Sequence, residues 1–395
     1  RTDGESSPLN YCGNSRPCQS KKRVVFTTRS FLRNSSTGYL CITDSETWAG
    51  RRGEVMTKWI AVSMLVGFCG VSGCTSEPEE PVIDSTPELE TSAGSILRVD
   101  PALDAIVPVD ARIEKLHAGF AFTEGPVWVQ QPSPHLLFSD VRGNAIYKWT
   151  PDGDLSDFMN PVFDGEGPSV GSNGLTLDPE GRLILMEHGN RQVTRIESDG
   201  THTILADRYE GKRLNSPNDG AYSADGWLYF TDPPYGLPQQ DEDPAKELDF
   251  SGIYRLGPEG DLELLNREQT RPNGIAFSPD GSTLYVANSD AEHKVWMAYN
   301  VMDDGSLDSG RIFFDVTAET EPGSPDGLKV DQEGHVFATG PGGVWVLDPT
   351  GKHLGTIQPN EVPANVAWGN DGRTLYMTAR TGLYRVALTT QGLMP

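Results

Sequence analysis

Residues 173–187 read NGLTLDPEGRLILME, and this stretch decides the fold. It contains one short alternating strand, a turn built on Asp-Pro-Glu-Gly at 178–181, and a second apolar strand that ends in a polar residue. Two further strands follow at 192–196 and 203–206, separated by a Ser-Asp-Gly turn at 198–200. Four short strands joined by tight turns are the content of one blade of a β-propeller.

The same sequence pattern recurs along the chain. Each copy opens with a polar residue, continues with an alternating strand and a glycine-containing turn, and closes with a second strand. The copies start 49, 45, 55, 53 and 39 residues apart, close to the roughly 40–50 residues of a four-stranded blade. We therefore predict an all-β fold, a six-bladed propeller. The opening polar residues are Glu124, Asn173, Asn218, Asn273, Asp326 and Asn365.

The last copy supplies only three strands before the chain ends, the third at 382–386. Segment 111–116 lies ahead of the first copy and can pair into the last blade. Such a strand would close the ring and remove its exposed edges. The Pro-rich, acidic insertion at 233–250 interrupts the third copy and is expected to form a loop over one face.

The beginning of the chain differs from the rest in charge and cysteine content. All five cysteines lie within residues 1–74, so neither a disulfide nor a thiolate metal site is expected beyond them. Residues 1–73 hold ten Lys and Arg against five Asp and Glu, whereas residues 74–395 hold 22 against 51. This acidic balance argues against a nucleic-acid partner, because binding to phosphates relies on Lys and Arg.

The N-terminal part of the chain has features of an export signal. Met56 precedes an apolar run at 59–73, which is shorter than the roughly 20 residues of a membrane-spanning helix and has the form of a signal peptide. The sequence Val-Ser-Gly-Cys at 71–74 resembles the bacterial lipobox, which implies cleavage before Cys74 and lipidation of its sulfur. An ordinary secretory signal with an incidental cysteine is the alternative. The expected location is the periplasm, or the outer membrane through the lipid anchor.

These observations predict four regions. They are a non-native upstream or disordered segment at 1–55, a signal peptide at 56–73, a lipidated acidic tether rich in Pro and Ser at 74–108, and the propeller at 109–395.

The six opening residues predict a metal site. Each precedes the first strand of its blade, which is the innermost, so their side chains should converge on one mouth of the central channel. All six offer a carboxylate or amide oxygen. Ca²⁺ binds such oxygens, whereas zinc would recruit His or Cys. We expect one divalent cation, Ca²⁺ in the first place, with Zn²⁺, Mg²⁺ and Mn²⁺ as alternatives. The competing interpretation is that these residues only cap turns, which leaves the replacement of Asn by Glu124 and Asp326 unexplained.

Five motifs resemble the gluconolactonase, senescence-marker-protein and luciferin-regenerating-enzyme family over about residues 110–390. They are EGPVW at 124–128, SPNDG at 216–220, TDPPYG at 231–236, RPNGI at 271–275 and SPDGL at 324–328. The resemblance implies a six-bladed propeller with a catalytic divalent metal bound by Glu124, Asn218, Asn273 and Asp326. It also implies hydrolysis of sugar lactones, with Asp326 as the acid/base group.

This chemistry is physically reasonable. A cation with open coordination positions polarises a lactone carbonyl and stabilises the oxyanion that forms when water attacks. A carboxylate within reach of that water removes its proton. Further candidates for binding a small-molecule lactone are Asn173, Asp219, Tyr235 and His188. Ser216 stands where animal members of the family have Arg, so recognition of the sugar hydroxyls differs here.

Two alternatives remain open at this point. One is an arylesterase or phosphotriesterase that uses the same metal site, and a panel of substrates separates it from a lactonase. The other is a non-catalytic ligand-binding propeller with a structural metal, for which Asp326→Asn would leave every activity unchanged.

Overall fold

The computed structural model describes residues 26–32, 41–47, 58–59, 92–165 and 170–395. The chain divides into two units, Arg1–Thr86 and Pro87–Pro395, which are described separately. In the first unit β1 (Phe26–Leu32), β2 (Cys41–Thr47) and β3 (Lys58–Trp59) form an antiparallel sheet. The prediction for residues 1–55 contained no strands, although the Phe, Thr and Ile in these segments favour them. The predicted signal peptide beyond Trp59, and Cys74, lie outside the described residues.

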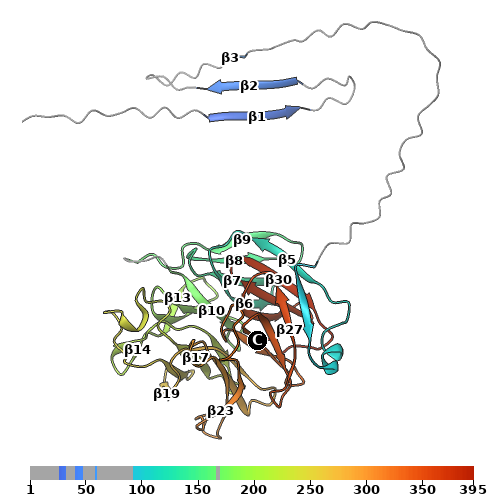
Figure 1. The fold of residues 1–395 in the computed structure, drawn as a ribbon. Helices are drawn as coiled ribbons and strands as arrows, with labels where there is room; N and C mark the ends of the chain where they lie inside the picture. The colour runs from blue at the N-terminus through green and yellow to red at the C-terminus, as the bar shows by residue number, and fades with distance from the viewer. Residues whose placement is uncertain (1–25, 33–40, 48–57, 60–91, 166–169) are drawn as a thin grey trace, which may run out of the picture. The chain divides into compact units, whose positions relative to one another are not determined.

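The second unit is a ring of six antiparallel sheets (Figure 1), so the prediction of a six-bladed β-propeller is confirmed. Blades 1 to 3 are β6–β9 (Thr123–Val129, His135–Asp140, Ala145–Trp149, Leu155–Met159), β10–β13 (Ser172–Leu177, Leu183–Glu187, Gln192–Ile196, His202–Ala206) and β16–β19 (Gly220–Tyr222, Leu228–Asp232, Gly252–Leu256, Leu262–Asn266). Blades 4 to 6 are β20–β23 (Pro272–Phe277, Thr283–Asn288, Val295–Asn300, Arg311–Asp315), β24–β27 (Leu328–Val330, Val336–Gly340, Gly343–Leu347, His353–Pro359) and β28–β30 (Pro363–Gly369, Thr374–Ala379, Gly382–Ala387) with β5 (Ile113–Ala118).

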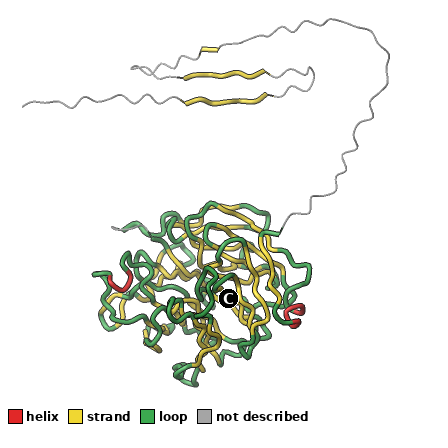
Figure 2. Tube along the Cα trace, viewed as in Figure 1, coloured by secondary structure: helices red, strands yellow, loops and turns green. Residues whose placement is uncertain are grey.

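The ring is closed by contacts between blades. First strands of successive blades contact one another all the way round, and β28 of the last blade contacts β6 of the first. Figure 2 shows how little helix is present: the described residues include two short 3₁₀ turns, η1 (Pro101–Ala105) and η2 (Gln240–Glu242), and a two-stranded ribbon, β14 (Arg208–Tyr209) with β15 (Lys212–Arg213). Among these residues, none forms a helix long and apolar enough to cross a membrane.

The strand ahead of the first blade completes the last one, as expected. β5 pairs antiparallel with β30, and Ile113, which is 1% exposed, lies opposite Val386 in the shared hydrophobic core. The element begins two residues later than the predicted segment 111–116. A strand from each end of the propeller therefore holds blade 6 together, which removes a free sheet edge.

The predicted tether at 74–108 is too long. β4 (Gly94–Arg98) pairs with β27 as a fifth strand of blade 5, and Leu103 and Val107 are fully buried in the core shared by blades 5 and 6. Few apolar residues are needed here because the strand adds to an existing sheet edge, so its composition resembles that of a linker. The remainder of the predicted tether, residues 74–91, lies outside the described residues.

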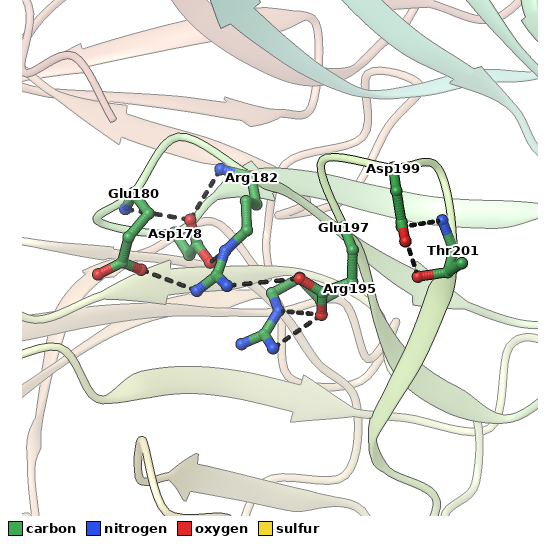
Figure 3. Close-up of polar contacts among 7 residues, drawn as sticks. All are labelled: Asp178, Glu180, Arg182, Arg195, Glu197, Asp199 and Thr201. Carbon is green, nitrogen blue, oxygen red and sulfur yellow. Dashed lines mark hydrogen bonds and ion pairs between the residues drawn. The ribbon is translucent and has the colours of Figure 1, made fainter.

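Aspartates hold the turns of blade 2 (Figure 3). In blade 2 the Asp178 carboxylate accepts hydrogen bonds from the backbone N–H groups of Glu180 (3.1 Å) and Arg182 (2.7 Å), and from the Arg182 guanidinium (2.7 Å). Asp199 accepts from the backbone N–H of Thr201 at 2.9 Å. Local capping of this kind is the usual use of Asp in turns.

Candidate active site

Glycines bring the inner strands close enough for the polar residues at their starts to approach one another. Gly125 has a φ of +49°, and a Cβ there would lie 2.1 Å from the carbonyl oxygen of Asn173 in the next blade. A Cβ on Gly274 would lie 2.3 Å from the carbonyl oxygen of Asp326. Gly174 and Gly327 are confined in the same way by the next blade. In these four copies the glycine after the opening residue is therefore required for close packing, whereas Asp219 and Val366 take that position in the other two.

A cavity of about 420 Å³ lies at this mouth of the ring. The loop insertion at 233–250 contributes Tyr235 and Gln240 to its wall, as expected for a loop over one face. Seven residues singled out from the sequence line the cavity together: Glu124, Asn173, His188, Asn218, Tyr235, Asn273 and Asp326.

Two predicted residues do not line this cavity. Asn365 donates a hydrogen bond from Nδ2 to Oδ2 of Asp219 at 3.2 Å, and the same Asp219 oxygen lies 4.0 Å from Nζ of Lys329. Lys329 lines a second cavity of about 410 Å³, formed by later residues of the same inner strands. Asp219 is therefore a buried residue of the channel wall with an ammonium group nearby. It does not line the site cavity.

The amide residues of the site are linked by hydrogen bonds. Asn218 donates from Nδ2 to Oδ1 of Asn273, whose own Nδ2 donates to Oγ of Ser289 at 2.8 Å. Nε2 of His188 lies 3.2 Å from Oδ1 of Asn218. An amide oxygen only accepts hydrogen bonds, so the imidazole is the donor. Burial lowers the pKa of His188 to about 4, which keeps the ring neutral at physiological pH.

The two carboxylic acids of the predicted ligand set are electrostatically coupled. Glu124 is 2% exposed. Burial, opposed by the N–H of Gly125 and reinforced by the charge of Asp219, raises the pKa of Glu124 to about 7. Burial and then the charges of Glu124 and Asp219 raise the pKa of Asp326 well above its usual value. A bound cation would relieve the repulsion among these carboxylates.

The donor set fits a hard divalent cation. Asn173 Oδ1 and Asp326 Oδ1 are buried and have no hydrogen-bond partner, which is unusual because buried polar atoms are nearly always paired. No group of three or more His, Cys, Asp and Glu side chains suited to a metal occurs within the described ranges. The predicted set instead joins two carboxylates to two amides, and oxygen donors of this kind suit Ca²⁺.

The capping interpretation accounts for part of the ring. Glu124 Oε2 accepts from the N–H of Gly125 at 2.9 Å, and Asn365 Oδ1 accepts from the N–H of Val366 at 2.8 Å. The side chains of Asn218 and Asn273 bond across blades instead. Local capping therefore does not explain the residues at the centre of the cavity.

Two buried acids that hold the site loops were missed by sequence reasoning. Asp140, at the end of β7, accepts from the backbone N–H groups of Ala121 and Phe122, each at 2.8 Å. Asp232, at the end of β17, accepts from two backbone N–H groups just ahead of Asn218, each at 2.7 Å, and burial raises the pKa of Asp232 to about 7. The available signal was their position, because each ends the second strand of its copy.

Ser216 has a structural role in this chain. It is fully buried, donates from Oγ to the carbonyl oxygen of Pro233 at 2.6 Å and accepts from the N–H of Gly236 at 2.8 Å. These bonds fix the loop that carries Tyr235, whose pKa burial raises to about 12. Ser216 itself does not line the site cavity, and the residues that do line it extend beyond the predicted ones. Those absent from the sequence prediction include Phe122, Arg142, Gln240, Ser289 and Arg380.

Fold and site together define a six-bladed β-propeller with an oxygen-rich polar cavity at one mouth of its ring. The protein belongs to the family described as SMP-30/Gluconolactonase/LRE-like region, whose model matches residues 122–381. The family resemblance inferred from the motifs is therefore confirmed.

Three relatives illustrate this membership. A gluconolactonase of Zymomonas mobilis is 38% identical over 320 residues, which cover 76% of this chain and 88% of the relative. A solved structure of a gluconolactonase from Xanthomonas campestris is 33% identical, with a TM-score of 0.65, over 74% of this chain and 94% of the other. A pentonolactonase of Haloferax volcanii is 28% identical over 66% of this chain and 81% of the relative.

Proposed function

We propose that this protein hydrolyses a sugar lactone with the help of a divalent cation held by Glu124, Asn218, Asn273 and Asp326. Its relatives include a gluconolactonase and a pentonolactonase, which support assignment to the lactonases, a class of carboxylic ester hydrolases. The observation that carries the proposal is the meeting of these four side chains, from four blades, in one cavity that also contains two unpartnered buried oxygens.

The four proposed ligands supply two negative charges and two neutral oxygens, which suits Ca²⁺. A cation bound there would polarise the lactone carbonyl and stabilise the charge that develops on its oxygen. His188 holds the Asn218 amide through the hydrogen bond from its neutral imidazole. It is therefore a positioning residue.

Asp326 is the proposed general base. Its Oδ1 has no hydrogen-bond partner and its side chain lines the cavity, where it can accept a proton from the attacking water. Tyr235 stays protonated, because burial raises its pKa to about 12. Its hydroxyl and the Asn173 amide are available to hydrogen-bond the hydroxyl groups of a sugar lactone.

The test is hydrolysis of glucono-1,5-lactone, followed by proton release, with and without chelator. We expect chelation, Asp326→Ala and Glu124→Gln each to lower kcat/KM by about a hundredfold or more. Asp261→Ala, in an exposed turn, is the control and should retain full activity. High activity in both variants and in chelator would refute the metal mechanism. A wild-type rate no higher than the spontaneous one, for this and other sugar lactones, would refute the function.

A further inference from the structure

Two arginines lie close to one aromatic ring at the wall of the site cavity. Arg142 lies between β7 and β8 of blade 1, Arg380 lies between β29 and β30 of blade 6, and both line the cavity. Their guanidinium carbons lie 5.4 and 5.9 Å from the centre of the Phe122 ring. We call these three residues the arginine clamp.

The clamp is unusual for this chain, which carries 56 Asp and Glu against 32 Lys and Arg. Within residues 92–165 and 170–395, no carboxylate forms an ion pair with either guanidinium, and the ring of Phe122 is their shared contact. Two cations near one ring raise the positive potential in this part of the cavity wall, and an anion within reach of both would be attracted by both. The clamp therefore has the electrostatic character of an anion-binding site within the wall of an otherwise acidic cavity.

The backbone holds this arrangement in place. The Asp140 carboxylate accepts from the N–H of the clamp residue Phe122 at 2.8 Å and from the N–H of Gly143, which follows the clamp residue Arg142, at 3.0 Å. Arg380 has a φ of +47° in a tight hairpin turn, where Gly or Asn is usual.

The clamp and the proposed catalytic residues can contact one small molecule. The positive charge of Arg380 acts on the Asp326 carboxyl, where it opposes the effect of burial on the pKa. Both side chains line the same cavity of about 420 Å³. A lactone ring at Asp326 could therefore extend a substituent toward Phe122.

We propose that the arginine clamp binds a second anionic group on the substrate, so that the protein prefers lactones that carry a carboxylate or phosphate in addition to the lactone ring. This inference rests on the proposed lactonase function and specifies its substrate class. Guanidinium groups pair bidentately with carboxylate and phosphate, and the face of Phe122 keeps them oriented. A neutral lactone would leave both guanidinium groups unpaired.

The experiment compares kcat/KM for glucono-1,5-lactone, its 6-phosphate, and glucaro-1,4-lactone, which carries a carboxylate. The variants are Arg142→Gln, Arg380→Gln, their double variant, and Arg380→Lys, which keeps the charge without the bidentate geometry. Arg267→Gln is a matched control, since Arg267 is also exposed and its guanidinium carbon lies 5.7 Å from the Phe250 ring, outside the cavity. The phosphate and carboxylate substrates distinguish the two possible anions.

We expect at least one anionic lactone to be preferred over the neutral one. Each Gln variant should lower kcat/KM for that substrate by about tenfold, mainly through KM, as expected for the loss of a charged hydrogen bond, and Arg380→Lys should lose less. For Arg142→Gln, kcat/KM for the neutral lactone should change by less than about twofold. Arg380→Gln also alters the Asp326 carboxyl, so its loss should be larger for the anionic than for the neutral lactone. For Arg267→Gln, kcat/KM should change by less than about twofold with all three substrates. Equal losses for neutral and anionic lactones, or no loss for either, would overturn the proposal.

Failure of the lactonase function has a separate readout. If the wild type hydrolyses none of the three lactones, calorimetry measures binding of 6-phosphogluconate and glucarate to the wild type and the double variant. Weaker binding to the double variant supports the clamp as an anion site. Equal binding, or no binding to the wild type, overturns it.

Discussion

Substitution of Glu124 by Gln should stabilise the metal-free protein although it lowers activity. The Glu124 carboxyl is buried and faces the charges of Asp219 and Asp326, with Lys329 as the opposing cation. Its pKa rises from 4.5 to about 7 on folding. Gln carries no charge, and its amide oxygen can still accept the N–H of Gly125.

The pH dependence follows from this change in pKa. A carboxyl with a raised pKa binds more protons in the folded than in the unfolded protein, so the free energy of unfolding falls as pH rises from 4.5 to about 7. At about 1.4 kcal/mol for each pH unit, the loss above pH 7 is about 3 kcal/mol. Below pH 4.5 the effect is absent because the carboxyl is protonated in both states.

Urea unfolding with chelator at pH 8.5 and pH 4.5 measures the difference. We expect the free energy of unfolding of Glu124→Gln to exceed that of the wild type by about 3 kcal/mol at the higher pH and to equal it at the lower pH. Glu259→Gln, in an exposed turn, is the control and should match the wild type at both. Added Ca²⁺ should stabilise the wild type more than the variant. A difference that is independent of pH, or a variant less stable at pH 8.5, would refute this reasoning.

Three further predictions concern the support of the site and the closure of the ring. His188→Ala should weaken Ca²⁺ binding by about tenfold or more, measured by calorimetry, because the hydrogen bond that orients the Asn218 amide is lost; unchanged affinity would contradict this. Asp140→Ala should lower the free energy of unfolding by about 2 kcal/mol in urea, because two part-buried backbone N–H groups ahead of β6 lose their charged acceptor, while Asp261→Ala has little effect. Ile113→Ala should cost about 2–4 kcal/mol by the same measurement, because the strand that closes blade 6 loses a buried side chain, and a cost below 1 kcal/mol would show that β5 is dispensable.

The fold could be predicted because its signals are local. The alternation of apolar and polar residues and the turns between 173 and 206 define the four strands of blade 2, and the structure places β11 and β12 at the predicted residues 183–187 and 192–196. Repetition then predicted the number of blades. The strand at Gly94–Arg98 was missed because it adds to the edge of β27, and the residues that make such an edge available lie more than 250 positions away in the chain.

The sequence alone identified the residues that open each copy. It also predicted that they lie at the starts of the inner strands. Only the packed ring decides which of these side chains share one cavity, because the orientation of each depends on the neighbouring blade. The cavity includes Glu124, Asn218, Asn273 and Asp326 but neither Asp219 nor Asn365. The arginine clamp had no sequence signal at all. Phe122 and Arg142 come from the first blade and Arg380 from the last, so they meet only because closure brings the two ends of the propeller together.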